Sequence, residues 1–328
     1  MSSIRDVARL AGVSPATVSR VMNGTARVED NKKDRVLKAI NDLGFVPNEV
    51  ARSLFRKSAR LIGLIIPNLH NPYYAQLAGA IDEAAAKFGY RSFLCEVGWD
   101  EKNIKNTLTT LKSMNVDGAV LTVSTPEVER FLGEFPLPVA ALDCIETANH
   151  VKASVFCDYY MGGRLAMEHL LACGCQKIVC IQASQDTFSA RMRYEGYRDV
   201  CREKKIPQYV LECDYDFLAG LAMTEKLLKL YPDADGILAC NDLVAVSTFK
   251  ILHKNHIDVP EQVQLVGFDD IHLASLISPE LTTIRQPLRE MAEKAVSCLV
   301  DEREMPASKT IIYPVTLMAR ETTKRGAS

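Results

Sequence analysis

The sequence predicts an N-terminal all-α head with a helix-turn-helix, followed by an α/β body of two doubly wound parallel-sheet lobes. Apolar residues recur at helical spacing through residues 4–43. From residue 61 onward, short apolar runs alternate with amphipathic helical segments, which is typical of βα units and parallel sheets. The chain has 328 residues, more than one core usually holds, and its βα units are too many for a single sheet.

The head begins with two helices joined by a tight turn. The first helix carries an apolar stripe that consists of Ile4, Val7, Ala8 and Ala11. Gly12 ends this helix in a turn of the kind that joins two helices at a steep angle. Ser14 is a good N-cap for the second helix, and Pro15 suits its first position because no N–H is needed there.

Two further apolar faces complete a small core over these helices. The second helix contributes Val18, Val21 and Met22. A third helix contributes Val36, Ala39, Ile40 and Leu43. Gly44 is a C-terminal stop for this third helix. Three short helices around one core make a helix-turn-helix domain, which we place at residues 1–46.

The outer face of the second helix presents small polar groups and one arginine. We predict that double-stranded DNA contacts Pro15, Ala16, Thr17, Ser19, Arg20 and Asn23. Arg20 can bond the O6/N7 edge of a guanine, while the hydroxyl and amide side chains can hold phosphates. Pro15 and Ala16 can touch base edges or a thymine methyl group. The alternative is a solvated helix surface, but the turn, the cap and the third helix together favour DNA recognition.

The charge distribution agrees with a DNA-binding head. Residues 1–60 contain 12 Lys and Arg but only 6 Asp and Glu, a net charge of +6. The whole chain carries −2, so residues 61–328 carry −8. A basic head on an acidic body suits DNA that is held by the head only.

Residues 47–59 are predicted to form a hinge helix and linker. Pro47 disfavours helix at the residue before it, and Asn48 can cap a short new helix. A helix of about two turns is marginal alone in water, so it needs its twin in a dimer or DNA. The predicted DNA contacts are Val50, Ala51, Ser53 and Leu54. Leu54 is either a packing residue or a wedge between base pairs in the minor groove.

The body, residues 60–328, is expected to alternate strands with helices. Strands are expected at 61–67, 91–95, 118–123, 138–142, 153–157, 177–181, 235–240 and 263–268. Helices are expected at 72–89, 101–114, 159–172, 190–204, 217–230 and 242–255. The two sheets that these elements form should enclose a cleft between them.

Polar residues follow the expected strands, where open parallel sheets bind their ligands. They are Asn68, Asn71, Tyr73, Tyr74, Asp143, Arg193, Asn241 and Asp269. Amides and carboxylates hydrogen-bond hydroxyls, an arginine forks onto adjacent oxygens, and aromatic faces stack on a sugar, so this set suits a neutral polyol. Asp242 and Asp270 are expected only to cap the helices after them. Trp99, the single tryptophan, is assigned no role.

Several classes of function lack their usual sequence features. The chain has no Gly-x-Gly-x-x-Gly, Walker or Gly-x-Ser-x-Gly motif, so we expect no catalytic residues and no cofactor. It has no charged-then-apolar leader and no apolar run near 18 residues, which predicts a cytoplasmic protein without a membrane partner. Its 10 cysteines lack metal-like spacing, apart from the pair Cys173 and Cys175, so we expect reduced thiols and no metal site.

Several head and hinge segments resemble the lactose/galactose-repressor family of bacterial transcription regulators. They are Asp6-Val-Ala, Val13-Ser, Thr17-Val-Ser-Arg-Val, Asn23, Pro47-Asn48 and Ala51-Arg-Ser-Leu54. The resemblance implies a homodimer whose heads read a palindromic operator, with Pro15, Ala16 and Arg20 on bases and Leu54 intercalated. It also implies a body like a periplasmic sugar-binding protein, with one lobe at about 60–158 and 288–316 and the other at about 159–287 and 317–323.

Within this family, the closest resemblance is to ribose-operon repressors. It rests on residues 48–54, 61–64, 231–237 and 314–323. The ribose pocket of the related binding proteins then maps to Asn71, Tyr73, Tyr74, Asp143, Arg193, Tyr215, Asn241, Asp269 and Gln286. The chain departs from the family pattern with tyrosines at 73 and 74 in place of phenylalanines, and with Cys144 in place of an arginine. Ribose stays the first expectation. Because of these departures, another pentose, a hexose or a derivative is the alternative.

These observations predict a repressor that a sugar releases from its operator. The alternative is a regulator whose DNA binding is strengthened by a nucleobase or another small metabolite, as in the purine-repressor branch. The marginal hinge helix between head and body suggests a two-state coupling, in which closing the cleft separates or joins the hinge helices of a dimer.

Overall fold

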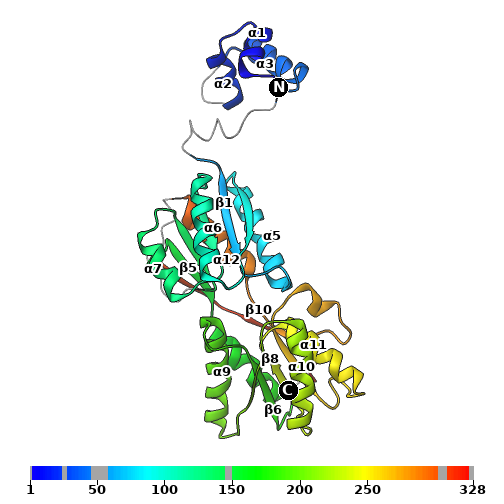
Figure 1. The fold of residues 1–328 in the computed structure, drawn as a ribbon. Coiled ribbons are helices and arrows are strands. Elements are labelled where there is room, and N and C mark those ends of the chain that lie inside the picture. The colour runs from blue at the N-terminus through cyan, green and yellow to red at the C-terminus, as the bar shows by residue number, and fades with distance from the viewer. Residues whose placement is uncertain (1, 24–27, 46–57, 145–149, 302–308, 325–328) are drawn as a thin grey trace. The chain divides into compact units, whose positions relative to one another are not determined.

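The computed structural model describes residues 2–23, 28–45, 58–144, 150–301 and 309–324. The chain divides into two compact units, Met1–Ala59 and Arg60–Ser328 (Figure 1). The predicted hinge contacts Val50, Ala51, Ser53 and Leu54 lie outside the described residues.

The head contains the three predicted helices, α1 (Ile4–Ala11), α2 (Pro15–Asn23) and α3 (Asp30–Asp42). Ser3 and Asp6 form a capping box at the start of α1, and Gly12 ends it with a left-handed φ of 61°. Arg35 of α3 donates to the carbonyl oxygens of Ala11 and Gly12, so the third helix holds the turn in place. The buried core of the head consists of Val7, Ala8, Ala11, Val18, Val36 and Ala39. The helix-turn-helix prediction is confirmed.

The first lobe of the body is a parallel sheet in the order β11-β5-β4-β3-β1-β2. Its strands are β1 (Leu61–Ile66), β2 (Arg91–Glu96), β3 (Gly118–Leu121), β4 (Val139–Leu142), β5 (Ala153–Cys157) and β11 (Thr310–Tyr313). Its helices are α5 (Pro72–Lys87), α6 (Glu101–Ser113), α7 (Pro126–Glu134) and α12 (Leu288–Val300). Alternate residues of β1 pack on opposite faces, since Leu64 joins the core under α5 and α12 while Ile65 joins the core under α6 and α7.

The second lobe is a sheet in the order β12-β10-β9-β8-β6-β7, parallel except for β12. Its strands are β6 (Ile178–Gln182), β7 (Tyr209–Glu212), β8 (Gly236–Ala239), β9 (Gln264–Asp269), β10 (Thr282–Arg285) and β12 (Thr316–Met318). Its helices are α8 (Tyr159–Ala172), α9 (Phe188–Lys204), α10 (Phe217–Leu230), α11 (Asp242–Lys254) and the short 3₁₀ helix η1 (His272–Ser275). The predicted fold class, a helix-turn-helix head and two parallel α/β lobes, is confirmed.

The chain passes between the two lobes three times. It crosses after β5, after β10 and between Tyr313 and Thr316, where β11 ends and β12 begins. One hydrophobic cluster runs through both lobes, from Ile62 of β1 to Phe268 of β9. The sequence analysis did not anticipate several elements. These are α7, β7, β10, α12, β11 and β12. The four strands among them have at most four residues each, too few for a clear alternation pattern.

Candidate functional site

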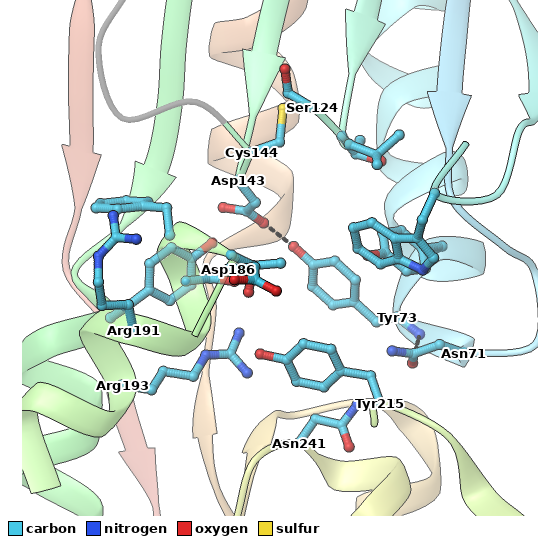
Figure 2. A pocket seen from close by; sticks show the side chains of 18 of the residues that line it. Asn71, Tyr73, Ser124, Asp143, Cys144, Asp186, Arg191, Arg193, Tyr215 and Asn241 are labelled. Carbon is cyan, nitrogen blue, oxygen red and sulfur yellow. Dashed lines mark hydrogen bonds between the residues drawn. The ribbon is translucent and has the colours of Figure 1, made fainter. Parts of the chain in front are cut away.

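A cavity of about 280 Å³ lies in the body between residues of the two lobes (Figure 2). Eight of the nine predicted effector residues line it: Asn71, Tyr73, Tyr74, Asp143, Arg193, Tyr215, Asn241 and Asp269. They come from segments up to about 200 residues apart in the sequence, which meet because parallel strands end on the same edge of each sheet. Gln286, the ninth residue, is buried behind this wall rather than on it.

The wall from the first lobe is built at the start of α5. Asn71 is buried, and its side-chain oxygen caps α5 by accepting a hydrogen bond of 3.1 Å from the N–H of Tyr73. This cap fixes the first turn, so that the Tyr73 hydroxyl donates a hydrogen bond to Oδ2 of Asp143, drawn dashed in Figure 2. Tyr74 packs edge-on against Tyr73, with ring centroids 5.2 Å apart.

Asp143 follows β4 directly and has a left-handed φ of 63°. Such a backbone is uncommon for a residue other than glycine, and it is tolerated where the surrounding structure holds it. Burial raises the pKa of the Asp143 carboxyl. Tyr73 occupies one carboxyl oxygen, while the other, Oδ1, is buried with no hydrogen-bond partner among the described residues.

Arg193 reaches the cavity from α9, where close helix packing fixes its backbone. A Cβ on Gly163 of α8 would lie only 2.1 Å from the Arg193 carbonyl oxygen, so only glycine permits this approach. The guanidinium donates to the Cys240 carbonyl at 2.8 Å and to Oδ1 of Asp269 at 3.3 Å. The guanidinium also lies over the Phe268 ring, 3.7 Å from the ring centroid. Its Nε is buried and has no hydrogen-bond partner among the described residues.

Asp269 ends β9 and is almost wholly buried. Its φ of 117° is again in the left-handed half of backbone space. Burial raises its pKa to about 6, against the opposing effect of the Arg193 charge. Gln286 donates from Nε2 to Oδ1 of Asp269 at 2.7 Å, so this predicted effector residue positions a residue of the cavity wall.

The structure corrects the expectation for the two aspartates that follow strand ends. Asp242 does not cap α11, because Asn241 does, accepting from the N–H of Val244 at 2.9 Å. Asp242 is instead fully buried, accepting hydrogen bonds from the Ile271 N–H and the Thr283 hydroxyl. A residue after a strand can cap the next helix only if its side chain points to the N–H groups of that helix. The carboxylate of Asp242 points instead to Ile271 and to Thr283 of β10.

Asp270 likewise caps no helix. Its carboxylate pairs with Arg285 of β10 at 2.6 Å and with Arg320 at 2.5 Å. The 3₁₀ helix η1 that follows has no side-chain cap. Asp270 therefore joins the end of β9 to β10 and to the segment after β12.

Several cavity residues were not predicted, and Trp99 is the clearest. It was assigned no role because its sequence neighbours are polar, yet it lines the cavity. The other residues that the sequence analysis missed include Thr122, Ser124, Thr125, Glu129, Tyr159, Asp186, Thr187, Phe188, Ser189 and Arg191. Ser124 and Thr125 directly precede α7, an element that was itself missed, and a Thr-Pro pair at 125 and 126 was the available signal for its start.

Cys144 also lines the cavity. Burial raises the pKa of its thiol well above the ordinary value. The neutral thiol donates to the Leu121 carbonyl at 3.1 Å. This position therefore supplies no cation to a ligand. All ten cysteines are free thiols, and no group of three or more His, Cys, Asp or Glu within the described ranges could hold a metal ion.

Five residues of the cavity wall carry a buried polar atom without a hydrogen-bond partner among the described residues. These atoms are Oδ1 of Asp143, Nε of Arg193, Nδ2 of Asn241 and the hydroxyls of Tyr159 and Tyr215. Each buried polar atom without a partner costs about 1–3 kcal/mol. The set comprises one acceptor, two donors and two hydroxyls, and ligand hydroxyl groups satisfy all of them because they both donate and accept. The arrangement can bind a small molecule rich in hydroxyls.

In the head, the predicted DNA-contacting residues lie on the outer side of α2. Pro15, Ala16 and Arg20 are exposed, while Thr17 and Ser19 are half-buried. The Ser14 hydroxyl caps α2 by accepting from the N–H of Thr17 at 3.2 Å. The side chain of Asn23 lies outside the described residues.

No helix in the described part of the chain is long and apolar enough to span a membrane.

Comparisons with known proteins match both units. Residues 3–48 match the model of bacterial regulatory proteins of the lacI family, and residues 167–323 match a periplasmic binding protein-like domain. The chain is 37% identical over 328 residues to a ribose operon repressor of Halalkalibacterium halodurans, covering 99% of this chain and 98% of the relative. It is 34% identical over 308 residues to the HTH-type transcriptional repressor PurR of Haemophilus influenzae, covering 92% and 91%.

A solved structure with the same architecture is the lac repressor dimer bound to operator and the anti-inducer ONPF. It matches with a TM-score of 0.87 at 26% identity, over 98% of each chain. The similarity thus extends over nearly the whole chain, head and body alike.

Proposed function

Since this chain belongs to the lacI family of bacterial regulatory proteins, we propose that it is a repressor released from a palindromic operator by a neutral sugar, with ribose the first candidate. Membership makes it a DNA-binding transcription repressor with an effector-binding body, and not an enzyme. Its partners are operator DNA and a small-molecule effector. The identity of that effector and the sign of its effect are the proposed part.

The observation that carries the sugar proposal is the set of unpartnered polar atoms in the cavity. Asp143, Arg193 and Asn241 each carry one of these buried polar atoms, which lack a hydrogen-bond partner among the described residues. A polyol supplies donors and acceptors on one ring and so satisfies all three. A relative that covers almost the full length is a ribose operon repressor, which agrees with this chemistry.

A nucleobase that strengthens DNA binding is the second candidate. The similarity to PurR at 34% identity favours it. The buried carboxyls of the cavity favour the sugar instead, because Asp143 and Asp269 suit a ligand with many hydroxyl donors.

We propose a homodimer as the working form. Edge strand β2 exposes Phe93 and Leu94, at 45% and 40% of their surface, and the second lobe exposes Leu218 and Leu276 at 70% and 74%. Exposed apolar side chains on an edge strand favour pairing with another chain. The lac repressor to which this chain is similar was solved as a dimer on its operator.

Operator binding measured with and without ligand tests the proposal. Fluorescence anisotropy on labelled operator should show weaker binding with saturating ribose, or with another pentose or hexose. Hypoxanthine and guanine, tested in parallel, should have no effect. An Asn241→Ala variant is the matched control, since it should bind operator normally but lose the sugar response.

Each outcome decides between the candidates. Tighter operator binding with a nucleobase would replace the sugar proposal by the corepressor alternative. Operator affinity unchanged by every sugar and nucleobase would contradict the coupling itself.

A further inference from the structure

Trp99 lines the cavity but belongs to none of the hydrophobic clusters of the described residues. Its side chain is 51% exposed, although tryptophan is the largest apolar side chain. It is also the single tryptophan of the chain. Core packing therefore does not account for its position on the cavity wall.

The loop that carries Trp99 is fixed on both sides. Val97 and Gly98 donate their N–H groups to the carbonyls of Ile66 and Pro67, at 3.0 and 2.8 Å. Gly98 has a left-handed φ of 68°, a backbone conformation that favours glycine. Asp100 then caps α6 by accepting from the Asn103 N–H at 2.8 Å. Hydrogen bonds thus hold the backbone on each side of Trp99, and they fix the position from which the indole extends.

The cavity differs between its buried and exposed parts. Asn71, Asn241 and Asp269 are almost fully buried, whereas Trp99 and Asp186 are exposed. The buried part contains the unpartnered polar atoms that suit a sugar ring. Trp99 lies in the part nearer solvent.

The cavity is larger than a monosaccharide. A pentose displaces the volume of roughly five waters at about 30 Å³ each. The cavity holds about 280 Å³, so nearly half of it remains when a pentose fills the buried part. That remainder is enough for one further ring.

We propose that Trp99 forms an outer subsite for a second ring attached at the anomeric carbon of the sugar, so that the effector is a glycoside rather than a free monosaccharide. An indole face stacks on the flat or C–H face of such a ring. The cavity wall also contains the polar side chains of Ser124, Thr125 and Asp186, which suit a ring that carries hydrogen-bonding groups. This inference rests on the proposed sugar effector.

The test compares matched ligands on the full-length protein. Calorimetry is performed with the free sugar, the methyl glycoside and the phenyl glycoside of ribose, xylose, glucose and galactose. Ribonucleosides and disaccharides of the best sugar then distinguish an aromatic second ring from a sugar ring. The variants are Trp99→Ala and Trp99→Phe, and the control is Leu230→Ala, an exposed apolar residue at the end of α10 that does not line the cavity.

For the wild type, we expect the phenyl glycoside of one sugar to bind at least tenfold more tightly than its methyl glycoside. Trp99→Ala should remove that difference while the free sugar binds within twofold of wild type. Trp99→Phe should keep most of it, and Leu230→Ala all of it. Phenyl binding should also change the tryptophan fluorescence, which comes from Trp99 alone.

Three results would overturn the inference. Free sugar binding with no preference for the phenyl over the methyl glycoside would remove the outer subsite and leave the proposed sugar effector intact. An equal loss for all three ligand forms in Trp99→Ala would assign Trp99 to the sugar ring itself. If no sugar binds in any form, the proposed function and the subsite both fail.

Discussion

The guanidinium of Arg193 joins Asp269 to the end of β8, with Nη2 3.3 Å from Oδ1 of Asp269 and Nη1 2.8 Å from the carbonyl oxygen of Cys240. It therefore holds together the carboxyl ends of two neighbouring strands. The same pair of charges lies on the cavity wall, so its geometry decides both the shape and the charge of the site.

Replacing Arg193 should abolish the ligand response and leave operator binding intact. In Arg193→Ala, the buried Asp269 loses its cation, and breaking such a pair costs about 3–5 kcal/mol of stability. We expect the dissociation constant of the sugar to rise by at least about 100-fold, since charge-assisted hydrogen bonds are lost. Calorimetry and thermal unfolding measure both effects.

Arg198→Ala is the control for this substitution. Arg198 lies on the same helix, pairs with Asp199 at the surface and does not line the cavity. It should change neither ligand affinity nor the operator response. A normal ligand response in Arg193→Ala would remove Arg193 from the site.

The stability of the free protein should depend on pH through Asp269. Burial raises the pKa of this carboxyl to about 6, above its ordinary value of 3.8. The protonated form is therefore favoured in the folded state, and the stability it contributes is present below about pH 4 and lost as the pH rises through 6. The difference corresponds to about 3 kcal/mol. Urea unfolding between pH 4 and 7 of wild type and Asp269→Asn measures it.

Ligand affinity should change with pH in the opposite direction. A hydroxyl that donates to Asp269 favours the ionised carboxylate, so binding should release a proton below pH 6. We expect the affinity to rise between pH 5 and 7 and to level off above that. Calorimetry in two buffers of different ionisation enthalpy detects the proton. Equal affinity at pH 5 and 7 would show that the ligand does not engage the carboxylate of Asp269.

Removing the exposed Arg20 side chain should weaken operator binding without affecting the body. A bidentate contact to guanine contributes about 1–3 kcal/mol of discrimination, so Arg20→Ala should lose about 5- to 150-fold in specific affinity. Anisotropy on operator and on a scrambled duplex separates specific from non-specific loss. Arg9→Ala, an exposed arginine on α1, is the control and should weaken both duplexes alike. Equal loss on both duplexes in Arg20→Ala would place Arg20 on phosphates.

Leu54→Ala should reduce operator bending and specific affinity while ligand binding stays the same. Inserting the side chain unstacks one base step, and the extra contacts that the protein makes with the bent DNA offset the free energy of unstacking. Loss of the side chain should therefore reduce the bend and the affinity together. Energy transfer between dyes at the operator ends measures the bend, and calorimetry measures ligand binding. Wild-type affinity in Leu54→Ala would leave this residue with a packing role only.

The sequence predictions were correct where a feature depends on residues close in the sequence, and they were wrong where it depends on residues far apart in the sequence. The Gly12 turn, the Ser14 cap and the Pro15 start depend on neighbours within about four residues, and all three appear in the structure. The cap role assigned to Asp242 was wrong, because a contact from Thr283, some forty residues away, decides where its carboxylate points. Trp99 was missed for a similar reason, since its polar sequence neighbours do not reveal that its loop adjoins the cavity.

The sequence by itself determined the helix-turn-helix, the alternation of strands and helices, and most of the residues at the strand ends. These follow from local propensity, periodicity and the rule that ligands bind beyond the carboxyl ends of parallel strands. Only the tertiary structure decided which polar atoms were left unpartnered, how Arg193 is shared between Asp269 and Cys240, and that Trp99 lines the same cavity. The physical reason is that burial and hydrogen-bond satisfaction depend on residues brought together from distant segments, whereas propensity and periodicity depend on near neighbours.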